Sequence, residues 1–376
     1  MKTVRASVVT SQFIPASGTG RGEMHLAVTL DCPEKTFAEQ CAVLFAAYDD
    51  TKSAHPTMKP VFERYFLSDS ATQQGVLEKL VADRNCAVSI VEQPPLNGTK
   101  IALLAVMQED VDVCRVQDGL TVVSADSYRW IYSTGMKGSS AGSGNQTREI
   151  LLDYCERLDE FGLCLADDCV RTWFFVQNID SNYSGVVSGR NAVFNMQGLT
   201  DTTHFISSTG IGGRTCDGRS LVMMDAVAAA GLLPGQMRYL YAPTHLNRTS
   251  EYGVSFERGT VVEYGDRRHV FISGTASIDN KGQVLYSGDI RRQTARMLEN
   301  VGALLNEAGC TLDDAMHFIV YLRDIADSRV VNEIFADRFP LKPYFIVYAP
   351  VCRPGWLIEV ECFAIGQCGE PRFQAL

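Results

Sequence analysis

Two stretches of the chain repeat one pattern, and this repetition limits the fold more than any other feature. Residues 312–325 read LDDAMHFIVYLRDI, and residues 166–179 read ADDCVRTWFFVQNI. Each contains a pair of aspartates, then an apolar run rich in β-branched and aromatic residues, then a polar pair before isoleucine. Apolar runs of this length and composition are typical of buried strands. The same helix-to-strand unit therefore occurs at least twice, which indicates internal repeats.

The residues around the first of these stretches define the repeating unit. Alternation of apolar and polar residues over 253–284 predicts paired strands, and helical spacing over 288–309 predicts a helix that stops at Gly309. The strand that follows leads into a shorter helix over 327–339, with Asp327 as its expected N-cap, and then into two closing strands. The element order is β-β-α-β-α-β-β.

The same order can be traced in the other two thirds of the chain. The middle third has expected helices over 145–163 and 189–198, and the first third has them over 36–50 and 71–84, with apolar strand patterns between them. We therefore expect an α+β fold with three repeats, which are residues 1–115, 116–244 and 245–376. Helices cover one face of such a sheet and leave the other to be buried. Three units can cover one another around a pseudo-threefold axis, as the subunits of a homotrimer would.

Composition and charge argue against several functional classes. The chain of 376 residues is 46% hydrophobic and 21% charged, as globular proteins are. No apolar run reaches the ~18 residues of a membrane span, and the first residues lack the apolar core of a signal peptide. We expect a cytoplasmic protein without a membrane partner. A formal net charge of −10 argues against a nucleic-acid partner and against endoribonuclease activity.

The cysteines and histidines do not predict a metal site. The chain has 12 cysteines and 6 histidines, but no Cys-x-x-Cys and no His-x-x-x-His. We interpret the cysteines as reduced and mostly buried. We therefore expect neither a metal nor another cofactor.

Four stretches of the last third resemble motifs of one enzyme family. They are VFISGTASIDNKGQV (270–284), GDIRRQTARMLENVGALLNEAG (288–309), the repeated stretch with the helix after it (312–339), and LIEVECFAI (357–365). In this order they resemble the strand–turn, helix, strand–helix and closing strand of the RidA (YjgF) superfamily of trimeric enamine and imine deaminases. The resemblance covers residues 253–365, and the first two thirds match in element order. It implies three RidA-like units that form a pseudo-trimer.

A second resemblance is to chorismatases, which are long chains that also contain RidA-like units. YLYAPTHLNRTSEYGVSFERG (239–259) resembles their Tyr-Gly…Ser-Phe-x-Arg segment, and VCRPGWLIEVE (351–361) resembles their Cys-Arg…Leu-x-Glu-x-Glu ending. This resemblance implies a substrate that carries carboxylates.

Glu359 is the strongest candidate for a catalytic group. Glu359 and Glu361 lie on one face of an alternating strand, and an inward-facing carboxylate is costly without a partner or a function. In both families the matching acid performs acid/base chemistry. Ala102 and Met223 occupy the corresponding positions of the other repeats, so we expect one working pocket and two structural interfaces. The alternative is a salt-bridged carboxylate at a strand edge.

Further residues are candidates for binding the substrate. An arginine can hold a carboxylate with two hydrogen bonds, and Arg353 lies across the closing turn from Glu359. The resemblances imply the remaining candidates, which are Tyr252, Arg248, Ser273, Gly274, Thr275, Asn332 and Tyr344. Gly274 can also be explained as a turn residue, Arg353 as a loop residue in solvent and Asn332 as a helix-surface residue.

One departure from the family pattern concerns the arginine with which RidA deaminases hold the substrate carboxylate. Tyr344 in the third repeat and His204 in the second correspond to it. Either another arginine, Arg353 or Arg214, replaces it, or the substrate differs.

We expect a small-molecule enzyme that adds water to an imine, an enamine or a related unsaturated carboxylate, with Glu359 as general acid/base. The alternatives are chorismatase-like release of pyruvate from chorismate and a non-catalytic ligand-binding protein. The expected partner is a small carboxylate. We expect a monomer that acts as a pseudo-trimer, and a higher oligomer stays open, as does the pair of repeats that walls the pocket.

Overall fold

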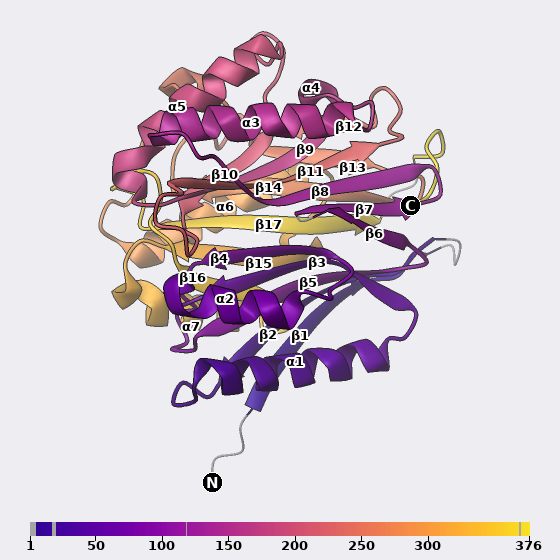
Figure 1. Ribbon diagram of the computed structural model, residues 1–376. Helices are drawn as coiled ribbons and strands as arrows, with labels where there is room; N and C mark the ends of the chain where they lie inside the picture. The colour runs from indigo at the N-terminus through magenta and orange to yellow at the C-terminus, as the bar shows by residue number, and fades with distance from the viewer. Residues whose placement is uncertain (1–4, 17–19, 118, 368–369) are drawn as a thin grey trace.

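Three β-sheets face one another in the computed structural model, which describes residues 5–16, 20–117, 119–367 and 370–376. Helices cover the outer faces of the sheets, with α3 and α5 at the top of Figure 1 and α1 and α2 at the bottom. No helix within these ranges is both long and apolar enough to cross a membrane. The expected α+β fold of three repeated units is therefore confirmed.

The first unit is a five-stranded sheet with two helices and the strand order β1-β2-β5-β3-β4. Its elements are β1 (Arg5–Phe13), β2 (Glu23–Asp31), α1 (Phe37–Ala54), β3 (Met58–Leu67), α2 (Ser70–Val81), β4 (Ala87–Glu92) and β5 (Ile101–Glu109). Thr36 and Glu39 form a capping box that begins α1. The order matches the expected β-β-α-β-α-β-β.

The second unit repeats this order and adds one strand, β6, at the edge of its sheet, which runs β10-β9-β11-β8-β7-β6. Its elements are β6 (Asp112–Gln117), β7 (Leu120–Ala125), β8 (Tyr128–Lys137), α3 (Ser143–Asp159), α4 (Leu165–Asp168), β9 (Cys169–Val176), α5 (Ile179–Met196), β10 (Ser207–Gly212) and β11 (Val222–Ala230). The helix expected over 189–198 thus begins ten residues earlier, because polar residues that face solvent hide its first turns.

The third unit also adds an edge strand, β12, to a sheet with the order β12-β13-β14-β17-β15-β16. Its elements are β12 (Met237–Leu240), η1 (Thr249–Tyr252), β13 (Gly259–Glu263), β14 (Arg267–Ala276), α6 (Ile290–Glu307), η2 (Leu312–Asp314), β15 (Ala315–Leu322), η3 (Ile325–Asp327), α7 (Ser328–Arg338), β16 (Tyr344–Tyr348) and β17 (Ile358–Gln367). Gly309, with φ of 72°, follows the end of α6, as expected.

The edge strands move the boundaries between the units. β6 pairs with β7 of the second sheet, and β12 pairs with β13 of the third. The sheets therefore change between Glu109 and Asp112 and between Ala230 and Met237, earlier than the boundaries expected at 115/116 and 244/245. Edge strands contribute few apolar contacts, so the pattern of apolar residues in their sequence does not show which sheet they join.

The repeated aspartate pairs lie in one-turn helices that lead into equivalent strands. Asp314 forms a capping box with Thr311 at η2, just before β15. Asp168 accepts a hydrogen bond from the backbone N–H of Cys164 at α4, just before β9. Asp327 is the N-cap residue of α7, as expected, but its side chain makes no cap hydrogen bond.

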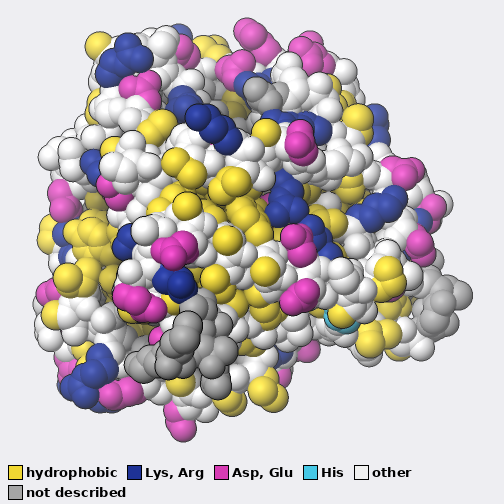
Figure 2. Space-filling model, turned by 60° about the horizontal axis from the view of Figure 1, so that its bottom comes forward, with side chains coloured by type: hydrophobic (Ala, Val, Ile, Leu, Met, Phe, Trp, Pro, Cys, Tyr) yellow, Lys and Arg dark blue, Asp and Glu magenta, His cyan; other side chains and the backbone are white. Residues whose placement is uncertain are grey.

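The three units dock in a cyclic manner. The segment after β4 pairs with β16 through Pro95 and Val347, the segment after β16 pairs with β10 through Val351 and Ile211, and Arg214, after β10, pairs with Glu92 of β4. Each unit thus extends the same edge of the next unit's sheet. Over the face in Figure 2, charged side chains of both signs are interspersed around a hydrophobic area.

Candidate active site

Glu359 lies on β17 where the second and third units meet. Its neighbours across the sheet are Ala276 on β14 and Tyr321 on β15, and its side chain is only 4% exposed. A Cβ atom added to Gly274 would lie 1.8 Å from the Glu359 carboxylate oxygen Oε1. The close approach of this carboxyl group therefore requires glycine at position 274. The φ of Gly274 is not positive, so a turn conformation does not explain the glycine.

The carboxyl group of Glu359 faces a narrow cavity of about 20 Å³ between the two units. The second unit contributes side chains from α5 and β10, and the third contributes the segment before β13, β14 and the turn before β17. The lining residues are Tyr183, Arg190, Ser208, Gly210, Val254, Phe256, Arg258, Gly274, Ala276, Ile278, Cys352, Arg353, Trp356 and Glu359. The second and third repeats thus wall this pocket.

Three arginines line the same cavity. Arg190 on α5 and Arg258 before β13 are 1% and 3% exposed, whereas Arg353 in the closing turn is exposed to solvent. Arg258 donates hydrogen bonds to the backbone oxygen of Asn247 at 3.0 Å and to its Oδ1 at 3.2 Å. Arginine binds carboxylates with good geometry. The cavity therefore combines one acid with three groups that can hold an anionic ligand.

Burial and, after it, the negative charge of Glu361 raise the pKa of Glu359 to about 8, against the opposing effects of Arg171 and Arg258. Among the described residues, none donates a hydrogen bond to the Glu359 carboxylate. The group is therefore mostly protonated at neutral pH. A buried carboxylic acid in this state can donate a proton to a bound molecule.

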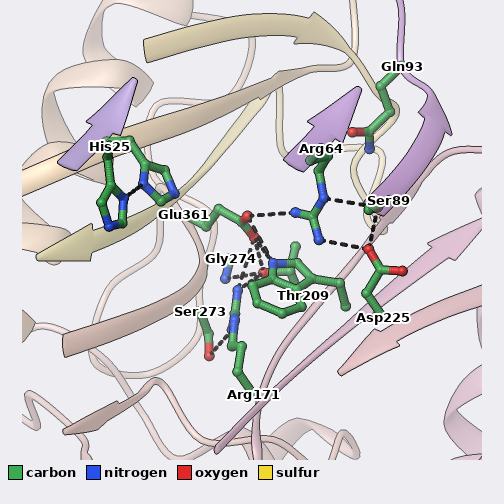
Figure 3. Close-up of polar contacts among 12 residues, drawn as sticks. His25, Arg64, Ser89, Gln93, Arg171, Thr209, Asp225, Ser273, Gly274 and Glu361 are labelled. Atoms are coloured by element: carbon green, nitrogen blue, oxygen red, sulfur yellow. Dashed lines mark hydrogen bonds and ion pairs between the residues drawn. The ribbon is translucent and has the colours of Figure 1, made fainter. Parts of the chain in front are cut away.

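Glu361, two residues along the same strand, has the opposite environment (Figure 3). Its carboxylate accepts hydrogen bonds from Arg171 at 3.0 Å, from Trp173 Nε1 at 2.9 Å and from Thr209 at 2.7 Å. Arg64 of the first unit lies 3.7 Å from it. All three units therefore meet at this carboxylate.

The network continues to the backbone beneath the site. Thr209 accepts a hydrogen bond from the Gly274 N–H at 3.0 Å, and Arg171 donates one to Ser273 at 2.9 Å. Arg64 also forms an ion pair with Asp225 at 2.9 Å. These contacts fix β14 and β10 relative to each other, and with them the position of Gly274 under Glu359.

Some of the expected site residues come together here. Arg353 and Gly274 line the cavity with Glu359. Ser273 and Thr275 lie on the same strand, but their hydroxyl groups are buried and bound to backbone carbonyl groups, at 2.6 Å to Glu257 and at 2.9 Å to Ser273. These two residues support the strand–turn and do not line the cavity.

Other expected residues lie elsewhere. Arg248 stacks on Tyr241 in a neighbouring pocket of about 360 Å³, which shares Arg258 with the Glu359 cavity. The side chain of Tyr252 lies outside the described part of the chain. Asn332 and Tyr344 line a groove between the first and third units.

The strand register corrects the expected correspondence between Tyr344 of the third unit and His204 of the second. Tyr344 is paired with Phe318 on β15, and the equivalent pair in the second unit is Ser208 with Thr172 on β9. Ser208, and not His204, therefore occupies the position of the carboxylate-binding arginine. Arg214 does not replace it, because it forms an ion pair with Glu92 at 2.6 Å on the interface with the first unit.

Sequence reasoning missed Arg190 and Arg258. Arg258 is the arginine of the quoted Ser-Phe-x-Arg segment, and this resemblance is the signal that could have marked it as a ligand. Arg190 lies four residues after Val186 and four before Phe194 on the buried face of α5, a spacing that could have marked it as an inward-facing cation.

The strand register also shows which residues of the first and second units correspond to Glu359. Leu67, Val176 and Leu322 pair with Ile101, Val222 and Ile358 at the same point of each sheet. The next residues of those three strands are Ala102, Met223 and Glu359. Only the third unit therefore has an acid at this position.

Comparisons with known proteins locate the similarity in the third unit and in the whole fold. Residues 260–366 match the family model of Endoribonuclease L-PSP. A RutC family protein of Pyrococcus abyssi is 39% identical over 97 residues, which are 25% of this chain and 76% of that protein. The 3-aminoacrylate deaminase RutC of Acinetobacter baylyi is 32% identical over 97 residues, 25% of this chain and 77% of that protein. A chorismatase crystal structure covers 81% of this chain and 93% of its own, with a TM-score of 0.64 at 18% identity, and therefore shows the fold.

Proposed function

Because the chain belongs to the RidA superfamily, we propose that it is an enzyme that adds water to a polarised double bond of a small carboxylate, with Glu359 as general acid and base. The observation that carries this proposal is a buried glutamic acid with a pKa of about 8 that faces three arginines. The arginines hold and orient the anionic substrate, and the acid supplies the proton.

The favoured reaction is hydrolysis of an enol ether of pyruvate. Glu359 donates its proton to the terminal CH₂ carbon of the double bond, and the adjacent carbon becomes an oxocarbenium ion. Water adds to that carbon, and the ionised Glu359 accepts a proton from this water molecule. The resulting hemiketal loses the alcohol, so that enol ether and water give alcohol and pyruvate. Arg258 and Arg171 stabilise the carboxylate of Glu359 between these steps, because both lower its pKa.

Three arginines favour a substrate with two carboxylates. Chorismate contains such an enol ether and a second carboxylate, and the whole-chain likeness to a chorismatase supports its choice as the first substrate to test. The second candidate reaction is deamination of an enamine such as 3-aminoacrylate. It is supported by the RutC relatives, although Ser208 stands where RidA deaminases have an arginine.

The cavity must widen before such a substrate can bind. Its volume of about 20 Å³ is below the roughly 300 Å³ of ordinary ligand pockets. The neighbouring pocket of about 360 Å³ shares Arg258 with it, and the backbone oxygen of Asn247 accepts a hydrogen bond from this arginine. We propose that substrate binding replaces the contact between Arg258 and Asn247 and joins the two spaces.

The test is turnover of both substrates by the purified protein and by Glu359→Gln. Pyruvate is measured with lactate dehydrogenase, and ammonia is measured after 3-aminoacrylate is generated in solution. We expect pyruvate from chorismate, and a loss of kcat of about 10²- to 10⁴-fold in the variant. Ammonia release without pyruvate would select the deaminase. Binding of chorismate without either product would contradict the proposal and favour a ligand-binding protein.

A further inference from the structure

Three histidines lie at the centre of the molecule, where the three sheets face one another. A cavity of about 70 Å³ at this place is lined by all three units, and His25 on β2, His269 on β14 and His317 on β15 are among its lining residues. The three side chains are 2%, 2% and 9% exposed. This cavity shares no described lining residue with the Glu359 cavity. The histidines therefore lie outside the site proposed for catalysis.

The histidines and Glu23 form one chain of polar contacts. His25 Nδ1 lies 2.7 Å from His317 Nδ1, and His25 Nε2 lies 2.9 Å from Glu23 Oε1. Glu23 Oε2 accepts a hydrogen bond from Gln108 at 3.0 Å and lies 3.1 Å from His269 Nε2. Because β2 belongs to the first unit and β14 and β15 belong to the third, this chain joins the two units.

The carboxylate of Glu23 determines which nitrogen of each ring carries a proton. Burial raises the pKa of Glu23, but His269 and His25 outweigh it and hold this pKa well below its usual range. Glu23 is therefore ionised and only accepts, so His25 Nε2 carries a proton. Burial lowers the pKa of His25 and holds that of His317 well below its usual value, so both rings are neutral at pH 7. His25 Nδ1 is then an acceptor, and His317 Nδ1 donates to it.

The contact between the two Nδ1 atoms has room for one proton and not for two. A first added proton is accommodated on His25, because the His317 ring then changes its tautomer and its Nδ1 accepts. A second proton places an N–H on both Nδ1 atoms, which are 2.7 Å apart, in two cationic rings with centroids 4.9 Å apart. The hydrogen bond is then lost, and the like charges repel each other.

The surroundings of the pair do not balance a second proton. The other titratable or charged groups that face the cluster are Arg64 on β3, Tyr132 on β8, Arg171 on β9, Tyr264 after β13, and Glu361 and Cys362 on β17. The two arginines are cations, and Glu361 is paired with both of them. Burial raises the pKa of both tyrosines and of the thiol, which therefore stay neutral. Among the described residues that line this cavity, Glu23 is thus the acid left to balance a proton, and it balances the first.

Phe363 connects the histidine pair with β17, the strand that carries Glu359. Its ring stacks on His25 with the centroids 4.8 Å apart, and it is parallel to the ring of His317 at 6.0 Å. Separation of the pair therefore removes packing from β17 as well as from the contact between the first and third units.

We propose that the His25–His317 pair is an acid-sensitive switch, which holds the first and third units together at neutral pH and releases them reversibly on acidification. The first proton reverses the hydrogen bond, and the second proton breaks it. This inference does not depend on the reaction proposed for Glu359.

Urea unfolding of the full chain between pH 7.5 and pH 5 tests the switch. The folded state keeps both rings neutral below the ordinary histidine pKa of about 6.5, whereas the unfolded chain protonates them. Stability is therefore full above this pH. Below it, the unfolding constant should rise by up to about 100-fold per pH unit, which is about tenfold for each ring.

Two variants assign this pH dependence to the pair. His317→Gln should reduce the rise to at most about tenfold per pH unit, because the amide can donate to neutral His25 and accept from its protonated form. His55→Gln is the control and should leave the rise unchanged, because His55 lies at the end of α1, outside the cluster.

Two measurements on the unmodified protein identify the contact itself. Nitrogen-15 NMR of the histidine-labelled protein at pH 7.5 should show His25 protonated on Nε2 alone and His317 on Nδ1 alone. Hydrogen exchange, corrected for its intrinsic pH dependence, should show that β2 and β15 lose protection on acidification to pH 5 before α5 does, and regain it at pH 7.5.

The proposal is wrong if His317→Gln and the unmodified protein have the same pH dependence of unfolding, or if either ring is charged at pH 7.5. It is also wrong if α5 loses protection together with β2 and β15, or if the protection does not return at pH 7.5.

Discussion

Glu359 and Glu361 face the same side of one strand, yet their surroundings give them different tasks. Glu361 is surrounded by Arg171, Trp173 and Thr209, which donate hydrogen bonds to its charged form. Glu359 is buried without such donors among the described residues, and the charge of Glu361 raises its pKa further. Two neighbouring carboxyl groups with different environments are a usual means of placing a general acid.

The raised pKa of Glu359 predicts how Glu359→Gln changes stability. The carboxyl group binds its proton more tightly in the folded state, so the unmodified protein loses stability as pH rises from the usual glutamate pKa to about 8. Glutamine does not ionise, so the variant does not lose stability in this pH range. Urea unfolding should therefore find the variant more stable by a margin that grows up to pH 8, then levels off at on the order of 3 to 5 kcal/mol. A margin that is independent of pH would contradict this.

Gly274→Ala should displace the acid. The added Cβ would lie 1.8 Å from the Glu359 Oε1 and 3.1 Å from Thr209. We expect a loss of kcat of about 100-fold and a cost of about 1 to 3 kcal/mol in stability. Gly302→Ala in α6 is the control, because its Cβ meets only Leu312 at 3.9 Å, and it should stabilise by about 0.5 to 1 kcal/mol without changing kcat.

At the scale of elements, the ion network holds β17, β9 and β3 together, and Glu361→Gln tests it. The variant leaves Arg171 and Arg64 buried without this anion, which should cost about 3 to 5 kcal/mol. Glu333→Gln, which removes an exposed pair with Arg291, should cost less than about 1 kcal/mol. Glu361→Gln should also lower the pKa of Glu359, because it removes a neighbouring negative charge. Equal costs for the two variants would contradict the role of the network.

The sequence predicts the repeated elements well and the site only in part. Helix α6 and strand β17 have strong periodicity, and the resemblance of these segments identifies Glu359 and Gly274. The edge strands β6 and β12 and the first turns of α5 have weak apolar patterns. Arg190 reaches the site only because the second unit docks against the third, and a pattern within one repeat does not contain that information.

At the scale of the whole molecule, fusion of three units replaces the assembly of a trimer. The inner face of each sheet is already covered by the other two units, where Arg64, Arg171 and Glu361 meet. Units within one chain can differ in sequence, and here one interface has the acid whereas another has an open groove.

We expect the chain to be a monomer in solution, because the units already cover the inner faces of one another's sheets in the described part of the chain. Sedimentation equilibrium should give 41.4 kDa at all loading concentrations. A mass that rises with concentration toward a multiple of this value would show that the outer surface also forms an interface.

Infrared difference spectroscopy can show whether Glu359 is protonated at neutral pH, the property on which its role as general acid depends. The spectrum of Glu359→Gln is subtracted from that of the unmodified protein across a pH titration. We predict a protonated carboxyl C=O band at pH 6 to 7 that disappears with a pKa of about 8. Absence of this band at pH 6, with the carboxylate already ionised, would show that Glu359 is not a general acid at neutral pH.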